Sequence, residues 1–314
     1  MSASPPEWAT TLDGDQRAGI QQVVTAAGAV DGVAPLSEHA LLHLTARDSR
    51  AAQHLLLRAA GGGTAGHELA GYAQLDTTDD LRAHAELVVA PTHRRQGLGS
   101  AAIRALRERA PGGRLALWAH GNLPAAAGLA AGAGFRSVRT LWQLILPLTA
   151  AGGVGAAIWP AGATVRTFVP GQDDAAWLRC NARSFADHPE QGGWNADDLL
   201  LRRAEDWFDP AGFFVVDDPQ RPGELAGFHW TKIHPADPPE RTSPIGEVYV
   251  IGTDPSQQGT GLGKALLVHG LEYLRDRDLD EVMLYVDEDN PRALGMYERS
   301  GFRHARADVS YESE

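Results

Sequence analysis

A glycine-rich stretch in the second half of the sequence carries its clearest chemical signal. Residues 246–263 read GEVYVIGTDPSQQGTGLG, which predicts a β-branched strand, a proline turn and a glycine loop leading into a helix over 262–276. Glycines let the main chain come close to an anion because they carry no Cβ. The unpaired N–H groups and the positive dipole end of a helix favour the same ligand. The stretch therefore predicts a site for phosphate or pyrophosphate.

Two familiar phosphate loops do not fit these residues. A dinucleotide fingerprint needs Gly-x-Gly-x-x-Gly, whereas the glycines here are Gly259, Gly261 and Gly263. A P-loop needs Ser or Thr after its lysine, but Lys264 is followed by Ala265. A bare glycine turn is also common as a plain connection. The full order of strand, proline, Gln-x-x-Gly-x-Gly and helix, however, resembles the acetyl-CoA loop of the GNAT acetyltransferases.

The same pattern occurs twice in the chain. A second proline and glycine loop gives Pro91 to Pro255, and Gly97 to Gly261, the same separation of 164 residues. Leu-Ala-Gly at 69–71 recurs at 225–227, and Gly-Phe at 134–135 recurs at 301–302. These landmarks keep one order at nearly one offset, so the sequence predicts a duplicated domain and not a short solenoid repeat.

Length and composition support two soluble domains. The 314 residues suit an N-terminal domain over 1–150, a Gly/Ala-rich linker over 151–162 and a C-terminal domain over 163–314. A formal net charge of -12 argues against nucleic acid as a partner. No apolar run is long enough for a membrane span, and the N-terminus does not resemble a signal peptide. We therefore expect a cytoplasmic protein, and a monomer because the duplication already supplies a domain partner.

Strands that alternate with helices predict an α/β fold. The resemblance implies two tandem GNAT (acyl-CoA N-acyltransferase) domains, each a mixed twisted sheet flanked by helices. In the first half we expect helices over 15–28, 36–46 (capped by Ser37) and 124–133, paired strands over 53–60 and 68–75 around a glycine turn at 61–63, a strand, loop and helix over 85–110, a strand over 115–119 and a closing strand or two from 135. In the second half we expect helices over 173–185, 195–203, 262–276 and 291–300, strands over 213–216, 227–232, 282–286 and 303–311, and a proline-rich loop over 233–245.

Acetyl transfer to an amine needs a base for the ammonium proton, donors for the thioester oxyanion and a group that stabilises the thiolate. The resemblance implies that the strand before the glycine loop carries the base and diverges from the next strand, and that a tyrosine on a later helix meets the sulfur. Glu247, eight residues before Pro255, and Tyr297, five before Phe302, fit these places. The alternatives are a solvent-facing glutamate and a core aromatic residue. Transfer from a phenol (pKa about 10) to a thiolate (about 8.5) is uphill by roughly 2 kcal/mol, so a hydrogen bond to sulfur is easier.

The first half lacks this pair. Ala83 and Ala130 stand at the corresponding spacings, and Glu86 is three positions out of register, which also reverses its face of the strand. We therefore expect the first domain to bind the cofactor without performing chemistry. Cys180 is the only cysteine, which excludes an internal disulfide and a cysteine metal cluster, and we expect it to be a core residue and the protein to need no metal.

A narrower resemblance covers nearly the full length and is dense in the second half. The segments 188–192, 227–232, 246–250 and 284–290, with 35–38 in the first half, resemble a tandem-domain branch of the family that acetylates the cysteine amine of cysteinyl-glucosaminyl-inositol. It implies that Glu247 accepts the amine proton and Tyr297 acts as the acid at the CoA sulfur. The substrate-binding residues it implies are Glu38, Glu190, Lys232, Glu247 and Tyr285. Which of Asp187, His188 and Glu190 faces the ligand stays open.

The resemblance also implies two cofactor sites for acetyl-CoA. In the first half the cofactor-binding residues would be Leu87, Val88, Val89, Arg95, Gln96, Gly97, Leu98, Gly99 and Ser100. In the second half they would be Ile251, Gly252, Thr253, Gln258, Gly259, Thr260, Gly261, Leu262, Gly263, Lys264, Asn290, Pro291, Arg292, Ala293, Leu294 and Gly295. The local positive charge is expected from Arg94, Arg95 and Lys264.

Two other functions fit parts of the pattern. A tandem GNAT protein could acetylate a different primary amine, such as an aminosugar or a peptide N-terminus, because the Glu247 and Tyr297 pair would serve any of these. A CoA-binding sensor with relic folds would fit the first half alone. The sensor is disfavoured for the whole chain because both candidate catalytic residues are present.

Overall fold

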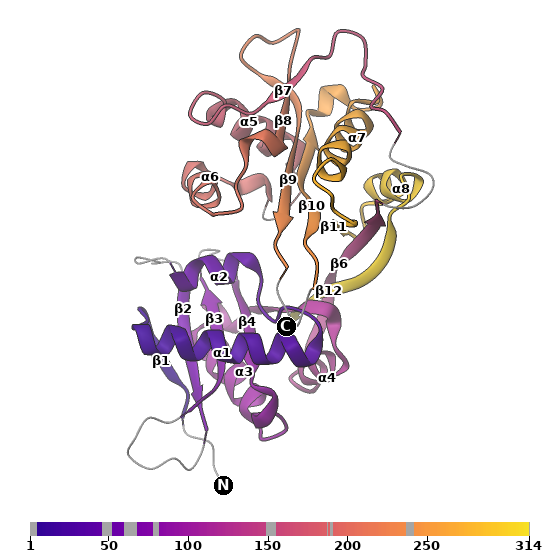
Figure 1. Cartoon of the computed structure of the whole chain (residues 1–314). Coiled ribbons are helices and arrows are strands. Elements are labelled where there is room, and N and C mark those ends of the chain that lie inside the picture. The colour runs from indigo at the N-terminus through magenta and orange to yellow at the C-terminus, as the bar shows by residue number, and fades with distance from the viewer. Residues whose placement is uncertain are drawn as a thin grey trace. The chain divides into compact units, whose positions relative to one another are not determined.

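The computed structural model describes residues 5–45, 52–59, 68–77, 82–148, 155–186, 188, 191–236 and 242–313 (Figure 1). Its internal contacts divide the chain into two compact units. The first comprises Met1–Trp142, Asp287–Asp289 and Arg306–Glu314, and the second comprises Gln143–Val286 and Asn290–Ala305. Most of the last strand, from Arg306 onward, thus belongs with the first unit. The domain limits 1–150, 151–162 and 163–314 follow the sequence repeat and stay a prediction, and residues 151–154 of that linker lie outside the described residues.

The first unit is a mixed sheet with helices on both faces. Its helices are α1 (Gly14–Asp31), α2 (Glu38–Thr45), α3 (Leu98–Arg109) and α4 (Pro124–Gly132). Its strands are β1 (Glu7–Ala9), β2 (Ala52–Arg58), β3 (Leu69–Asp76), β4 (Ala83–Val89), β5 (Leu115–Ala119), the start of β6 (Phe135–Pro147) and most of β12 (Arg303–Ser313). The order β1-β2-β3-β4-β5-β12 is antiparallel except for the parallel pair β4–β5.

Alternation along β4 separates the two faces of this sheet. Ala83 and Ala85 pack in the core against α3, whereas Val88 packs in the core formed with α1 and α2. Figure 1 shows α1 crossing the strands on that side. Because side chains in a strand alternate between faces, His84 and Glu86 share the α1 and α2 side with Val88. The titratable residues of β4 therefore point away from α3.

The second unit repeats this architecture. Its helices are α5 (Asp174–Ser184), α6 (Ala196–Arg203), α7 (Leu262–Arg275) and α8 (Pro291–Arg299). Its strands are β7 (Val165–Thr167), β8 (Phe213–Asp217), β9 (Leu225–His234), β10 (Ile245–Thr253) and β11 (Glu281–Asp287), joined by the end of β6. The order is β6-β11-β10-β9-β8-β7, and the pair β10–β11 is parallel. A cluster of aromatic rings fills the α5 and α6 side, with Phe213 stacked on Trp230 at 4.5 Å between centroids.

The predicted elements agree with the structure in type, and most of their ends agree within about two residues. Ser37 caps α2, since its Oγ accepts a hydrogen bond from the Ala40 N–H at 3.2 Å. The predicted loop 233–245 is too long at both ends, because β9 continues to His234 and β10 begins at Ile245. The short outermost strands β1 and β7 were not predicted. The expected turn at 61–63 lies outside the described residues.

Candidate active site

The glycine loop of the second unit has the conformation that an anion site needs. The short turn Pro255–Gln257 follows β10, and Gly261 immediately precedes α7. Gly259 and Gly261 have φ angles of 79° and 90°, a region that favours glycine. A Cβ built on either residue would meet nothing within 4 Å. Glycine is therefore required for the backbone turn, and the surface beside it is open to a ligand that approaches the helix N-terminus.

A buried carboxylate anchors this loop to its unit. Asp254 accepts hydrogen bonds from the Ser256 N–H and Oγ at 3.0 and 2.7 Å, and it pairs with Arg183 at 2.6 Å and Arg221 at 2.8 Å. Burial alone would raise the pKa of Asp254, but these hydrogen bonds and guanidinium groups hold it well below its ordinary value. The ionised anchor fixes the start of the loop against α5. Sequence reasoning missed it because the pairing is not local.

The loop of the first unit has the same shape with one substitution. Gly97 has a φ of 84°, and Arg95 has a φ of 63° at the place of Gly259. The prediction that Arg94 supplies cofactor charge is wrong: both terminal nitrogens of its guanidinium bond Asp31 at 2.7 Å, and its Nε donates to the Val89 carbonyl at 3.1 Å. Arg95 on its loop and Lys264 in the first turn of α7 are exposed, and their role at a cofactor stays a prediction.

Glu247 is a buried carboxylate, not a solvent-facing one, with 7% of its surface exposed. Its Oε2 lies 2.6 Å from Nε2 of His234. With Glu247 ionised, the imidazole nitrogen must donate, since a carboxylate only accepts. Lys232 is its direct partner across the β9–β10 ladder. The Lys232 ammonium lies 4.3 Å from the centroid of the Trp207 ring, a cation–π distance.

The strand that carries Glu247 diverges from its parallel neighbour at that residue. The register pairs only Gly246 with Val282 and Glu247 with Met283, although β10 and β11 are both described in full and continue beyond these residues. On the other edge of β10 the ladder shifts between Val248 and Val250, which marks a β-bulge. The gap expected for an acyl-CoA arm therefore opens directly after the candidate base.

The two candidate tyrosines lie in different surroundings. Tyr297 on α8 is buried and meets the Phe302 ring edge-to-face at 5.7 Å. Burial raises the pKa of Tyr297, so the phenol stays protonated at neutral pH, as a donor must. The raised pKa also makes a hydrogen bond to the sulfur easier than full proton transfer. Tyr285 on β11 is 40% exposed, and its hydroxyl accepts a hydrogen bond from Gln143 at 2.8 Å.

The structure describes only some of the remaining predicted site residues. Glu38 is the first residue of α2 in the first unit, whereas Lys232, Glu247 and Tyr285 belong to the second. Glu190 and Asp187 lie outside the described residues. His188 accepts a hydrogen bond at Nδ1 from the Gln191 N–H at 2.9 Å and so closes its own turn.

Two further residues from the sequence analysis have structural roles. Asn290 caps α8, since its side chain accepts from the Ala293 N–H at 3.1 Å. Cys180 is buried, and burial raises the pKa of its thiol to about 11, as suits a core residue and not a nucleophile.

The first unit differs from the prediction at the base position. The Leu-Ala-Gly motifs align Lys232 on β9 with Asp76 on β3. The cross-strand partner of Lys232 is Glu247, and that of Asp76 is His84. The offset between these two partners is one residue smaller than that between the prolines of the two loops, because the bulge adds one residue to β10. The counterpart of Glu247 is therefore His84 and not Ala83. Glu86 lies two positions from His84, on the same face of β4, which also corrects the predicted reversal. Ala130, buried in α4, does correspond to Tyr297 by the 167-residue offset of the two Gly-Phe motifs.

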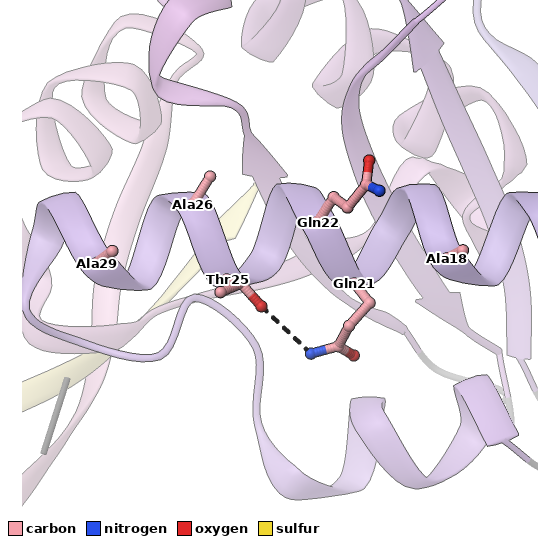
Figure 2. A pocket seen from close by; sticks show the side chains of 6 residues that line it. All are labelled: Ala18, Gln21, Gln22, Thr25, Ala26 and Ala29. Atoms are coloured by element: carbon pink, nitrogen blue, oxygen red, sulfur yellow. Dashed lines mark hydrogen bonds between the residues drawn. The ribbon is translucent and has the colours of Figure 1, made fainter. Parts of the chain in front are cut away.

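We found no second candidate for a reaction site among the hollows and side-chain clusters of the described residues. Figure 2 shows a shallow hollow along the outer face of α1, lined by Ala18, Gln21, Gln22, Thr25, Ala26 and Ala29. It holds no titratable group. No helix in the described part of the chain is long and apolar enough to cross a membrane. Within those same residues, no three His, Cys, Asp or Glu side chains gather as they would around a metal ion.

Comparison with known proteins identifies the class. The model of the Acetyltransferase (GNAT) family matches residues 32–135 and 177–302, most of both halves, and the chain therefore belongs to this family. It is an acetyl-CoA-dependent N-acetyltransferase with two tandem GNAT folds.

The individual relatives narrow the class further. A mycothiol acetyltransferase from Salinispora arenicola is 52% identical over 304 residues, which cover 96% of this chain and 94% of that protein. A mycothiol acetyltransferase from Thermomonospora curvata is 52% identical over 298 residues, covering 94% and 93%. The crystal structure of a GCN5-related N-acetyltransferase from Sphaerobacter thermophilus has a TM-score of 0.68 at 23% identity and covers 99% of this chain and 96% of its own. That likeness supports the fold.

Proposed function

We propose that this protein transfers the acetyl group of acetyl-CoA to the cysteine amine of cysteinyl-glucosaminyl-inositol, the last step of mycothiol biosynthesis. The observation that carries the proposal is the buried Glu247, placed where β10 leaves β11, in a chain about half identical to mycothiol acetyltransferases. The cosubstrate supplies an activated acyl group as a thioester. The residues of this chain supply proton transfer, orientation and charge.

Glu247 is the base. It takes a proton from the substrate ammonium, directly or through one water, so that the neutral amine can attack the thioester carbon. The new C–N bond then forms as the C–S bond breaks. His234 holds the carboxylate in one orientation through its bond of 2.6 Å. His234 was not among the predicted site residues, although its two-residue spacing from Lys232 on one strand places both on one face.

Tyr297 is the acid. Its protonated phenol hydrogen-bonds the departing sulfur or gives it a proton, and the raised pKa favours the first of these two actions. Loops on both units fit a pantetheine pyrophosphate, since the surfaces beside Gly97, Gly259 and Gly261 are open. In the second unit Gln258–Lys264 and Ile251–Thr253 would hold acetyl-CoA, with Asn290–Gly295 beside it.

The substrate contacts are polar, as a ligand rich in hydroxyl groups requires. Glu38, Glu190, Lys232 and Tyr285 would bind the sugar and inositol. The Trp207 ring lies against the Lys232 ammonium and helps to hold that side chain in place.

The first unit would bind a second acetyl-CoA through Leu87–Val89 and Arg95–Ser100 without turning it over, because Ala130 replaces the acid. We further propose that the protein works as a cytoplasmic monomer, without a metal, a nucleic acid or a membrane as partner.

An acetyl-CoA turnover assay by thiol release tests the proposal. The purified chain is given cysteinyl-glucosaminyl-inositol beside glucosaminyl-inositol, free aminosugars and an N-terminal cysteine peptide. We expect strong preference for the cysteinyl pseudodisaccharide. Turnover only on other amines would refute the substrate assignment while keeping the acid and base. Binding of CoA without turnover on any amine would favour a sensor.

A further inference from the structure

A buried carboxylate holds the residue that precedes Glu38. In the first unit, Oε2 of Glu86 accepts the Ser37 N–H at 2.6 Å, and Oε1 accepts the Ser37 hydroxyl at 2.6 Å. The Ser37 oxygen in turn accepts the Ala40 N–H at 3.2 Å and caps α2. Two strong hydrogen bonds and a cap thus fix the first turn of the helix on which Glu38 is the first residue.

Glu86 is one end of a buried ionic chain. Nε2 of His120 lies 3.4 Å from Oε2 of Glu86, and Nδ1 of His120 bonds Oδ2 of Asp308 at 2.9 Å. The other oxygen of Asp308 accepts the Gly121 N–H at 2.7 Å. The side chains of His120, Glu86 and Asp308 are 12%, 12% and 10% exposed. Asp308 lies on β12, so the network joins the last strand of the chain to the start of α2.

The network combines one positive and two negative charges. Burial alone would lower the pKa of His120, but the charge of Glu86 and the bond to Asp308 raise it to about 10. Burial would raise the pKa of Glu86, but His120 and the bonds from Ser37 hold it below its ordinary value. At neutral pH an imidazolium therefore lies between two carboxylates. Buried ions cost free energy relative to apolar residues of the same size, so stability by itself does not account for them.

None of these groups acts in the proposed chemistry. Both oxygens of Glu86 accept from Ser37, and the unit has Ala130 in place of the acid. The network ends at the start of α2, where Ser37 caps the helix. We propose that Asp308, His120, Glu86 and Ser37 form a positioning network that holds Glu38 in place for the cysteinyl pseudodisaccharide. This inference rests on the proposed function, since Glu38 is there a substrate contact.

The expected effect is selective for one substrate. His120→Gln removes the cation and leaves the buried Glu86 without its counter-ion, which loosens its hold on the first turn of α2. Loss of one well-held ligand contact corresponds to about a tenfold rise in KM for the pseudodisaccharide. The network touches neither acid nor base, so kcat and the KM for acetyl-CoA stay within about twofold.

A double-mutant cycle on KM tests the coupling. The variants are His120→Gln, Glu38→Gln and the two combined. If the network acts through Glu38, His120→Gln raises the KM of the pseudodisaccharide in the wild-type background and has no further effect beside Glu38→Gln. An equal effect in both backgrounds, or a fall in kcat with unchanged KM, would overturn the inference. Absence of pseudodisaccharide turnover by the wild type would instead refute the proposed function.

Ser37→Ala covers the case in which His120→Gln does not fold. It leaves the ionic groups in place and removes one bond to Glu86 together with the helix cap. The same rise in KM is expected, again lost beside Glu38→Gln, and an unchanged KM would overturn the inference. Asp31→Asn is the matched control, because it breaks the Arg94 pair elsewhere in the unit and should leave both KM values unchanged.

Discussion

His84 on β4 and Glu247 on β10 occupy the same register position in their two sheets. Each faces a residue of opposite charge type across an antiparallel ladder, Asp76 in the first unit and Lys232 in the second. The carboxylate and the basic group have thus exchanged strands. In the first unit the carboxylate of Asp76 lies 3.6 Å from His39, and in the second Glu247 lies 2.6 Å from His234. Both copies keep a titratable pair at this register position, but only the second has a tyrosine on the later helix.

Replacing Glu247 with Gln is expected to lower turnover by about a hundredfold or more, since it removes the general base. The dependence of kcat/KM on pH should also lose the part that the base contributes, because Gln cannot take up the proton. His84→Gln is the matched control at the same register position, and we expect it to leave the rate unchanged. Steady-state thiol release between pH 6 and 9 measures both. A pH profile of Glu247→Gln that overlays the wild type would exclude this residue as the base.

Replacing His234 with Ala tests whether the imidazole orients Glu247. We expect kcat to fall about tenfold, because one hydrogen bond to a charged group contributes roughly 1.5 kcal/mol. The KM for acetyl-CoA should not change, since His234 lies apart from the glycine loop in sequence and on another strand. His234→Asn, which can still donate a hydrogen bond, should recover part of the rate. Equal losses in the two variants would indicate that His234 does not act by donation.

Much of this site could be predicted from the spacing of its residues. The predictions that failed did so for local structural reasons. The distance from Pro255 placed Glu247 on a strand, but counting from Pro91 missed His84 because a one-residue bulge does not appear in composition. His234 was assigned to a loop because prolines follow it. The membership of β12 in the first unit could not be read from the repeat, since either copy of a duplicated fold can accept the same closing strand. The link between Glu86 and Asp308 depends on that strand.

Replacing Tyr297 with Phe removes the hydroxyl and keeps the ring packed on Phe302. We expect stability to change little and kcat to fall by about a hundredfold if the phenol assists departure of the thiolate. The loss should shrink with an acyl thioester of a more acidic thiol, because such a leaving group needs less help. Turnover of both thioesters by the variant and the wild type gives this comparison. A loss that does not depend on the thiol would remove Tyr297 from the acid role.

The ionic network should make stability depend on pH at its alkaline end. His120 has a pKa of about 10 in the folded chain against an ordinary value near 6.5. A raised pKa contributes stability that is complete below pH 6.5 and is lost as pH rises toward 10. The expected slope is at most about 1.4 kcal/mol per pH unit.

Urea unfolding of the wild type and of His120→Gln at intervals from pH 6.5 to 9.5 measures this contribution. The wild type should lose stability relative to the variant over this range, since Gln does not titrate. Parallel curves would show that His120 is not held as an imidazolium.

The glycine loop of the second unit should be needed for turnover, whereas that of the first unit should be needed only to bind acetyl-CoA. Gly261 and Gly97 both have a φ near 85° to 90° at the residue before their helix, so an alanine at either costs about 1–2 kcal/mol of backbone strain and displaces the loop. Gly261→Ala should raise the KM for acetyl-CoA about tenfold or more, whereas Gly97→Ala should leave turnover unchanged and lower the acetyl-CoA bound per chain from two molecules toward one.

Isothermal titration measures the number of acetyl-CoA molecules bound per chain, and steady-state kinetics measures the KM and the turnover. A loss of turnover in Gly97→Ala equal to that in Gly261→Ala would contradict the division, and so would a wild-type chain that binds a single acetyl-CoA. The comparison is well matched, because neither glycine packs against a neighbour and the strain of the added methyl group acts through the loop alone.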